Sequence, residues 1–165
     1  MTHQPILILT TGGTIDKAYF DALSEYQIVD SGIPALLREA RVALPFRVVE
    51  LMRKDSLELT GEDRTLIASA AREAPESRIV VTHGTDTMTE TARVLAAEVP
   101  GKTIVLTGAL SPARFAETDA PFNLGMAIAT VQVASLGVWI VMSGQVFDGL
   151  RVRKDRAAGR FVGVD

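Results

Sequence analysis

Four short apolar runs constrain this chain more than any other feature. Each holds three or four consecutive apolar residues and is followed within a few residues by glycine; they lie at 6–9, 79–81, 104–106 and 138–141. A weaker candidate lies at 46–51. Runs of this kind are typical of strands that are buried on both faces. They predict a sheet that is covered on both sides.

Helical patterns occupy the stretches between these runs. The clearest begins at Asp86 and ends before Pro100, with apolar residues at helical spacing between them. Thr60 is placed to cap a second helix, and Pro121 to open a third. Strands that alternate with helices predict an α/β protein, here a three-layer α/β/α sandwich with a mainly parallel sheet.

Two segments interrupt this order. Residues 16–31 mix aromatic and charged side chains without helical or alternating spacing, which predicts a loop or a loose hairpin. Residues 151–156 are mostly charged, and the nine residues that follow are too few to begin another domain. From the length of 165 residues we expect a single domain over residues 1–165.

Composition excludes several classes of site and partner. The chain has no cysteine, which rules out disulfides, a thiol nucleophile, and iron–sulfur or cysteine-bound zinc sites. Its net charge is -3 and it has no dense basic block, so nucleic acid is not expected as a partner. No cationic leader and no apolar stretch approaching the roughly 20 residues of a membrane span is found. We therefore expect a soluble, cytoplasmic protein that does not bind membranes.

A binding site is expected just after the apolar runs, because ligands of open parallel sheets bind outside the carboxyl ends of the strands. Threonine, serine and glycine predominate in these segments, which are 10–14, 82–86, 107–109 and 143–144. Gly12 and Gly13 permit a tight turn that exposes N–H groups and Thr14, although a plain strand-to-loop turn has the same signature. Asp86 suits the N-cap of the following helix as well as a catalytic role.

A hydroxyl nucleophile needs a base, and the chain offers no cysteine and no convincing histidine for it. His83 is better explained as a structural side chain, and no nearby pair of ligands completes a metal site. A lysine held by an aspartate could take the proton, and Lys154, Asp86 and Thr85 supply this set if the last segment folds over the strand ends. Backbone N–H groups near Gly13 and Thr85 could then stabilise an oxyanion.

Four segments resemble the signature blocks of the bacterial-type L-asparaginases. They occur in the order of that family over nearly the whole chain: TTGGTI at 10–15, VTHGTDTMTETA at 81–92, TGALSPARFAETDAPFNL at 107–124 and FDGLRVRK at 147–154. The resemblance implies hydrolysis of the side-chain amide of L-asparagine to L-aspartate and ammonia through an acyl-enzyme. It implies that no cofactor and no metal takes part.

The same resemblance implies roles for individual residues. Thr14 matches the threonine nucleophile, and Thr85 matches the second catalytic hydroxyl. Asp86 and Lys154 match the aspartate and lysine that complete the second triad, and Asp86 would also bind the α-ammonium group of the substrate. Further substrate contacts are expected from Gly13 and Gly84.

The chain departs from the family in its length. The common form has a second, C-terminal domain, which we expect this chain to lack, because it resembles the short single-domain members. That domain normally sends a glutamate from a neighbouring subunit to the substrate, a contact that is expected to be absent or replaced. The surface that the domain would cover favours a homo-oligomer, a dimer or a tetramer.

A second departure lies where the family has GSQD and this chain has MRKD, at residues 52–55. Arg53 or Lys54 could hold the α-carboxylate of the substrate by charge. Asp55 and Ser56 are the alternative, and we favour them as the substrate-binding pair.

The third departure concerns the lid tyrosine, for which Tyr26 fits the family alignment and Tyr19 lies closer to Thr14. Glutamine is the rival substrate, because it differs from asparagine by a single methylene. A glutaminase-asparaginase of broader specificity is therefore one alternative function. A noncatalytic amino-acid-binding module of the same fold is the other.

Overall fold

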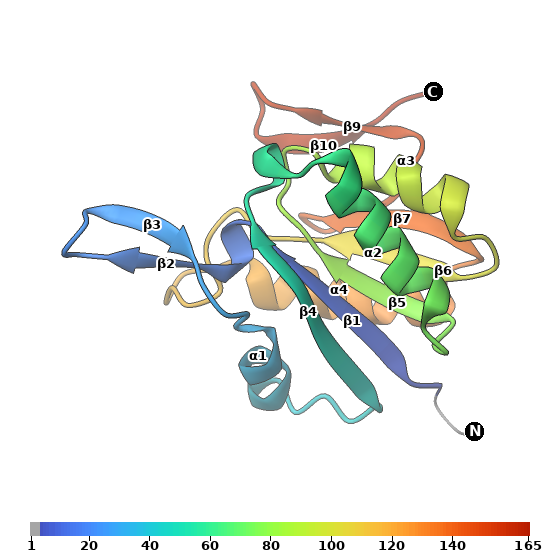
Figure 1. The fold of residues 1–165 in the computed structure, drawn as a ribbon, viewed down its shortest axis with the longest axis horizontal. Coiled ribbons are helices and arrows are strands. Elements are labelled where there is room, and N and C mark those ends of the chain that lie inside the picture. The colour runs from blue at the N-terminus through green and yellow to red at the C-terminus, as the bar shows by residue number, and fades with distance from the viewer. Residues whose placement is uncertain (1–3) are drawn as a thin grey trace.

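A six-stranded sheet forms the centre of the fold (Figure 1). The computed structural model describes residues 4–165. In spatial order, the strands are β4 (Phe46–Lys54), β1 (Ile6–Gly12), β5 (Arg78–Thr82), β6 (Thr103–Thr107), β7 (Gly137–Met142) and β8 (Gln145–Asp148). The first five are parallel, and β8 pairs antiparallel with β7. Every apolar run lies in a strand of this sheet, so the predicted mainly parallel sheet is confirmed.

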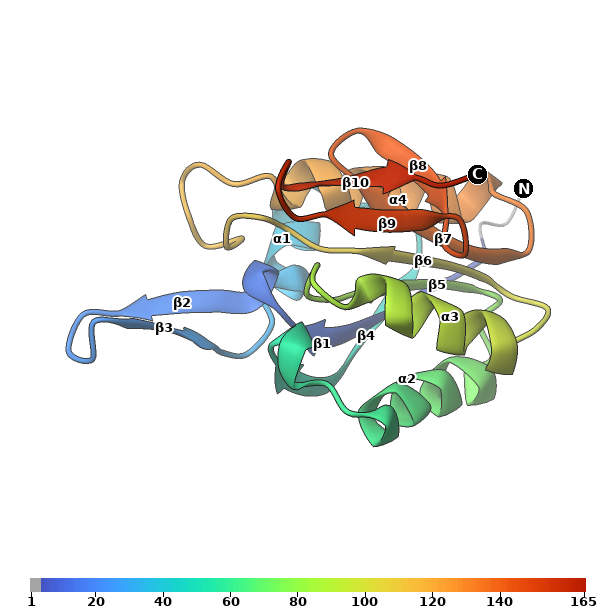
Figure 2. The same ribbon diagram turned by 90° about the horizontal axis from the view of Figure 1, so that it is seen from above.

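Helices cover both faces of the sheet (Figure 2). They are α1 (Ile33–Glu39), α2 (Gly61–Glu73), α3 (Met88–Glu98) and α4 (Ala120–Val133). Leu7 and Leu9 of β1 pack into the core beneath α2 and α3, whereas Ile6 and Ile8 pack into the core beneath α1 and α4. Both faces of β1 are thus removed from water, which explains its uninterrupted apolar sequence and confirms the three-layer architecture. Within residues 4–165, no helix is long and apolar enough to span a membrane.

Local sequence explains how two of the helices begin. Thr60 caps α2 in a capping box, in which its Oγ1 accepts from the Asp63 N–H and the Asp63 carboxylate accepts from the Thr60 N–H. Pro121 lies in the first turn of α4, as predicted. The predicted start of α3 is wrong: the helix begins at Met88, and Asp86 lies before its N-cap position.

Two hairpins lie outside the central sheet. Their strands are β2 (Lys17–Phe20) with β3 (Glu25–Ile28), and β9 (Val152–Asp155) with β10 (Arg160–Gly163). The first projects away from the sheet (Figure 1), so the hairpin is the correct one of the two forms expected for residues 16–31. The second is anchored by Val152 and Phe161, which are buried in the same core as α3. The charged segment therefore packs back onto the sheet.

Candidate functional site

The carboxyl ends of β1 and β5 meet in a close backbone contact. Gly12 and Gly13 have φ angles of 105° and 82°, which residues with a side chain rarely adopt. A Cβ on Gly13 would lie 2.5 Å from the backbone nitrogen of Gly84. Glycine at this position therefore lets Thr14 lie alongside the loop that carries Thr85.

Lys154 reaches the β5 loop from the far end of the sequence. Its Nζ donates hydrogen bonds to Thr85 Oγ1 at 2.8 Å and to Asp86 Oδ1 at 2.6 Å. The lysine side chain is 16% exposed and the aspartate side chain 34%, so water only partly screens this ion pair. Asp86 precedes Thr87, the N-cap residue of α3, and bonds Lys154 through one carboxylate oxygen. The structure thus brings together the three residues that the sequence suggested for proton transfer.

Thr14 follows the glycine turn directly and begins η1 (Thr14–Asp16), a short 3-10 turn. Its carbonyl accepts a hydrogen bond from the Lys17 N–H, which closes the turn. Thr14 is partly exposed, whereas Gly12 and Gly13 before it are buried. The Gly13 N–H, by contrast, donates to the Lys54 carbonyl at 2.9 Å. The N–H of Gly13 itself therefore joins β1 to β4, and an oxyanion site near Gly13 and Thr85 stays a prediction.

Asp55 and Ser56 follow β4 at the same edge of the sheet. The Asp55 carboxylate begins the 3-10 turn η2 (Ser56–Glu58) and pairs with Lys17, whose Nζ lies 3.1 Å from Oδ2. Ser56 is 1% exposed, and its Oγ has no partner in the part of the chain that the structure describes. A Cβ on Gly84 would lie 2.7 Å from Ser56 Oγ. The serine therefore packs directly on the backbone that precedes Thr85.

Positive charges act on Asp55 from two directions. Partial burial works to raise the pKa of this carboxyl, but the Leu57 N–H bond and the charges of Lys17 and Lys154 outweigh it and hold the pKa below its usual value. The field of Lys154 thus reaches Asp55 as well as Asp86. Two lysine–carboxylate pairs, Lys17 with Asp55 and Lys154 with Asp86, thus lie at this edge of the sheet.

Arg53 and Lys54, the other candidates for the α-carboxylate, are held elsewhere. Arg53 Nε donates to Glu50 Oε1 at 2.7 Å, and Lys54 Nζ donates to Asp63 at 2.8 Å. Each cation is thus engaged by a carboxylate that is not part of the site. The end of β4 instead contributes Asp55 and Ser56, the pair that we favoured from the sequence.

The two tyrosines share the projecting hairpin. Tyr19 and Tyr26 are opposite each other in the β2–β3 ladder, with ring centroids 5.0 Å apart, and the Tyr26 ring lies 5.9 Å from that of Phe115. Both are about half exposed. Either ring could serve a lid, because the hairpin carries them as one unit.

His83 is buried at the start of the β5 loop. Gly84 O can only accept, so Nδ1 donates to it at 2.6 Å and Nε2 accepts from the Thr91 hydroxyl at 2.7 Å. Burial lowers the pKa of this imidazole to about 4, so the ring is neutral near pH 7. Both ring nitrogens are used within the fold, in agreement with the structural role expected for it.

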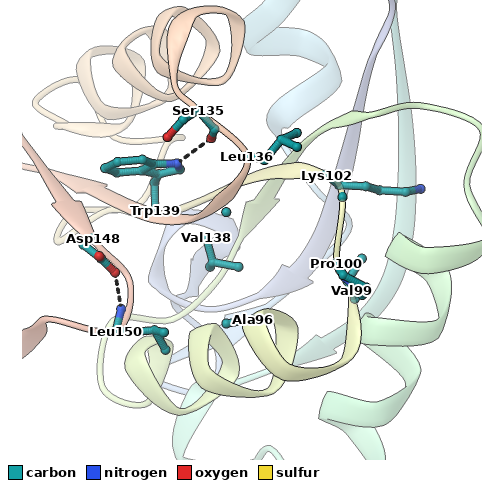
Figure 3. A pocket seen from close by; sticks show the side chains of 12 residues that line it. Ala96, Val99, Pro100, Lys102, Ser135, Leu136, Val138, Trp139, Asp148 and Leu150 are labelled. Carbon is teal, nitrogen blue, oxygen red and sulfur yellow. Dashed lines mark hydrogen bonds between the residues drawn. The ribbon is translucent and has the colours of Figure 1, made fainter.

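Outside this edge, residues 4–165 hold no candidate metal cluster, and one surface pocket lies at the far end of the sheet. Among residues 4–165, no group of three or more His, Cys, Asp or Glu side chains is placed to hold a metal ion. A surface pocket of about 440 Å³ lies at the opposite end of the parallel strands (Figure 3). There the indole N–H of Trp139 donates to the Ser135 carbonyl, and the backbone N–H of Leu150 donates to the Asp148 carboxylate. This pocket shares no residue with the site.

A family model described as "Asparaginase, N-terminal" matches residues 5–161. The chain belongs to the asparaginase family. An L-asparaginase of Thermococcus kodakarensis is 32% identical over 163 residues, 93% of this chain and 48% of that protein. A glutaminase-asparaginase of Pseudomonas fluorescens biotype A is 30% identical over 162 residues, 90% of this chain and 45% of that protein.

Solved structures of asparaginases have the same fold. The thermostable L-asparaginase from Thermococcus kodakarensis superposes with a TM-score of 0.85 at 28% identity, over 96% of this chain and 51% of that chain. L-asparaginase I from Vibrio cholerae gives 0.83 at 28% identity, over 97% and 51%. The chain thus spans about half the length of the relatives it matches.

Sequence reasoning missed two residues that shape this edge. Asp16 is buried, its carboxylate accepts from Ser31 Oγ and the Gly32 N–H at 3.0 Å, and its carbonyl accepts from the Val29 N–H. It therefore ties together both ends of the β2–β3 hairpin. Lys17 follows it and reaches Asp55. An acidic residue directly after the TGGTI block was the available signal, but its side-chain partners Ser31 and Gly32 lie beyond the whole hairpin in sequence.

His83 predicts a stability profile that depends on pH. Between pH 6.5 and about 4, the unfolded chain takes a proton on this imidazole and the folded chain does not. We expect its contribution to the free energy of unfolding to be complete above pH 6.5 and to decline by about 3 kcal/mol as the pH falls to about 4. Urea unfolding of wild type and His83→Gln measures this, because all other groups are common to both. Parallel pH profiles would contradict the prediction.

Proposed function

We propose that this chain is an L-asparaginase, which hydrolyses the side-chain amide of L-asparagine to L-aspartate and ammonia through a threonine acyl-enzyme. The observation that carries the proposal is the contact of Lys154 with Thr85 and Asp86, in a loop whose backbone touches the turn before Thr14. The proposed nucleophile Thr14 and the proposed proton-transfer group Lys154 thus lie at one edge of the sheet in a member of the asparaginase family.

The proposed reaction has two stages. In the first, Thr14 Oγ1 attacks the amide carbon of the substrate, the carbon–nitrogen bond breaks, and the hydroxyl proton leaves with ammonia. In the second, water attacks the resulting ester, and its proton returns to Thr14 as L-aspartate departs. No cofactor or metal enters this scheme.

Thr85, Asp86 and Lys154 would move the protons in this scheme. In this scheme the Lys154 amine, 2.8 Å from Thr85 Oγ1, takes a proton from the Thr85 hydroxyl and gives it back, so that Thr85 can relay the proton between Thr14 or water and the leaving group. Asp86 fixes the lysine, and its second oxygen is available to the α-ammonium group of the substrate. The residues proposed to contact the substrate are Gly13, Asp55, Ser56, Gly84, Thr85 and Asp86.

We predict that Thr14→Ala, Thr85→Val and Lys154→Met each lower kcat on L-asparagine by about 100-fold or more, because each removes a group from the reacting centre. Thr65→Ala is the matched control, since Thr65 is exposed on α2 and bonds only its own helix. Ammonia release measures turnover, and circular dichroism checks the fold. Near-normal turnover of a folded variant would remove that residue from the mechanism.

A glutaminase-asparaginase of broader specificity is the second candidate, favoured by relatives with that name at 30% identity. For the asparagine-specific enzyme, we expect kcat/KM on L-asparagine to exceed that on L-glutamine by roughly 10- to 200-fold, the usual effect of one methylene. The same ammonia assay with both amides measures the ratio. Comparable efficiencies would favour the broader enzyme, and absence of turnover would favour a noncatalytic binding module.

The proposal includes a homo-oligomer, a dimer or a tetramer. Large apolar side chains are exposed at the two ends of α4 and after it, with Phe122 60%, Val133 84% and Leu136 68% exposed. The helix has no charged residue along its length. An apolar helix face of this kind usually packs against another surface.

The absence of nucleic-acid partners and the cytoplasmic location stay predictions, which a mobility-shift assay and cell fractionation check.

We predict a solution mass of two or four times the chain mass of 17.7 kDa. Light scattering at micromolar concentration measures it. Val133→Glu should shift the distribution toward the monomer, because a buried unpaired charge opposes association. A strict monomer in the wild type would contradict the prediction.

A further inference from the structure

The proposed chemistry gives Asp55 a contact with the substrate but assigns no role to its ion-pair partner Lys17, which lies at the same site. Lys17 is bound through its backbone N–H to the carbonyl of Thr14, the proposed nucleophile. Its partner Asp55 precedes Ser56, which packs on Gly84. The two charged side chains are 25% and 33% exposed, so a small ligand from solvent can reach both.

An α-amino acid presents two opposite charges on neighbouring atoms, and a site that selects it needs a cation and an anion at that spacing. Lys154 is engaged by Thr85 and Asp86. Lys17 differs, because within residues 4–165 its ammonium makes one hydrogen bond, to Asp55 Oδ2. Two of its three N–H donors therefore remain for a ligand.

We propose that Lys17 is a specificity-determining residue that binds the α-carboxylate of the substrate by exchanging its ion pair with Asp55 for one with the ligand. The inference rests on the proposed function, since it concerns the same site. When the ligand binds, the α-carboxylate takes the place of the Asp55 carboxylate on Lys17. Asp55 is then available to the α-ammonium group, beside Asp86.

Exchange of this kind is selective because charge balance is kept only for a zwitterion. L-asparagine replaces one ion pair by two, so neither Lys17 nor Asp55 is left without a counter-charge. A ligand whose α-carboxylate is replaced by a neutral amide cannot compensate Lys17, and the Lys17–Asp55 pair then competes with binding. Because water only partly screens the pair, these contacts are stronger than those of a fully exposed ion pair.

Position also favours Lys17 over other cations near the end of β4. Lys17 is the first residue of β2, directly after the turn that carries Thr14, and Asp16 fixes the root of this hairpin. Lys17 thus lies three residues after the proposed nucleophile, and its backbone is hydrogen-bonded to that residue. Arg53 and Lys54 lie beside Asp55 in sequence, but their side chains bond Glu50 and Asp63.

The test compares Lys17→Met, Lys17→Arg and wild type on L-asparagine and on L-aspartic acid diamide, which lacks the α-carboxylate. For Lys17→Met we expect KM for L-asparagine to rise about 10- to 100-fold, the usual effect of one charged hydrogen bond, with kcat within about threefold of wild type. KM for the diamide should not rise. Lys17→Arg should restore most of the affinity, because it keeps the charge.

Arg47→Met is the matched control, because it removes a cation from the Arg47–Glu76 ion pair at the opposite end of β4. It should leave both KM values unchanged. An unchanged KM of Lys17→Met for L-asparagine, or an equal rise for both amides, would overturn the inference while leaving the proposed function intact.

Calorimetry with L-aspartate separates the inference from the proposed function. We expect wild type to bind L-aspartate, and Lys17→Met to bind it at least tenfold more weakly, whether or not the chain turns over amides. Binding that depends on Lys17 without turnover would refute the proposed function alone. Binding that does not depend on Lys17, or no binding by wild type, would refute the inference.

Discussion

Contact between the backbones of Gly13 and Gly84 is the constraint on which the candidate site depends. A side chain at Gly13 would overlap the β5 loop, and one at Gly84 would overlap Ser56. Since the contact is made by backbone atoms at the ends of two paired strands, the spacing between the Thr14 and Thr85 loops is set by the sheet. A reacting centre built on such a frame needs little reorganisation when substrate binds.

The positive charges of the candidate site come from outside the central sheet. The carboxylates of Asp55 and Asp86 come from the ends of β4 and β5, whereas Lys17 and Lys154 come from the two small hairpins. The buried sheet thus fixes the negative groups, and the peripheral hairpins supply the positive ones. The first hairpin is tied at its root by Asp16, and the second is anchored by buried apolar side chains.

Sequence patterns predicted the parts of the fold that depend on burial alone. Uninterrupted apolar runs gave the strands, because both faces of the sheet are covered, and Thr60 and Pro121 marked helix starts through local backbone chemistry. Helix α1 was missed because it has only seven residues. Its two buried residues, Ile33 and Leu37, are too few to show a helical period. For Asp86, local sequence left a helix cap and a catalytic role both open; in the structure its carboxylate bonds Lys154, 68 residues away, and Thr87 is the N-cap of α3.

The sequence by itself determined that glycine and hydroxyl side chains gather at one edge of a parallel sheet, because strand order along the chain and burial of both faces fix which ends carry loops. Only the tertiary structure decided which charges meet there. The Lys154 contact with Thr85 spans 69 residues, and the Lys17 contact with Asp55 spans 38. Such contacts depend on how the hairpins pack against the sheet, and no local periodicity records that packing.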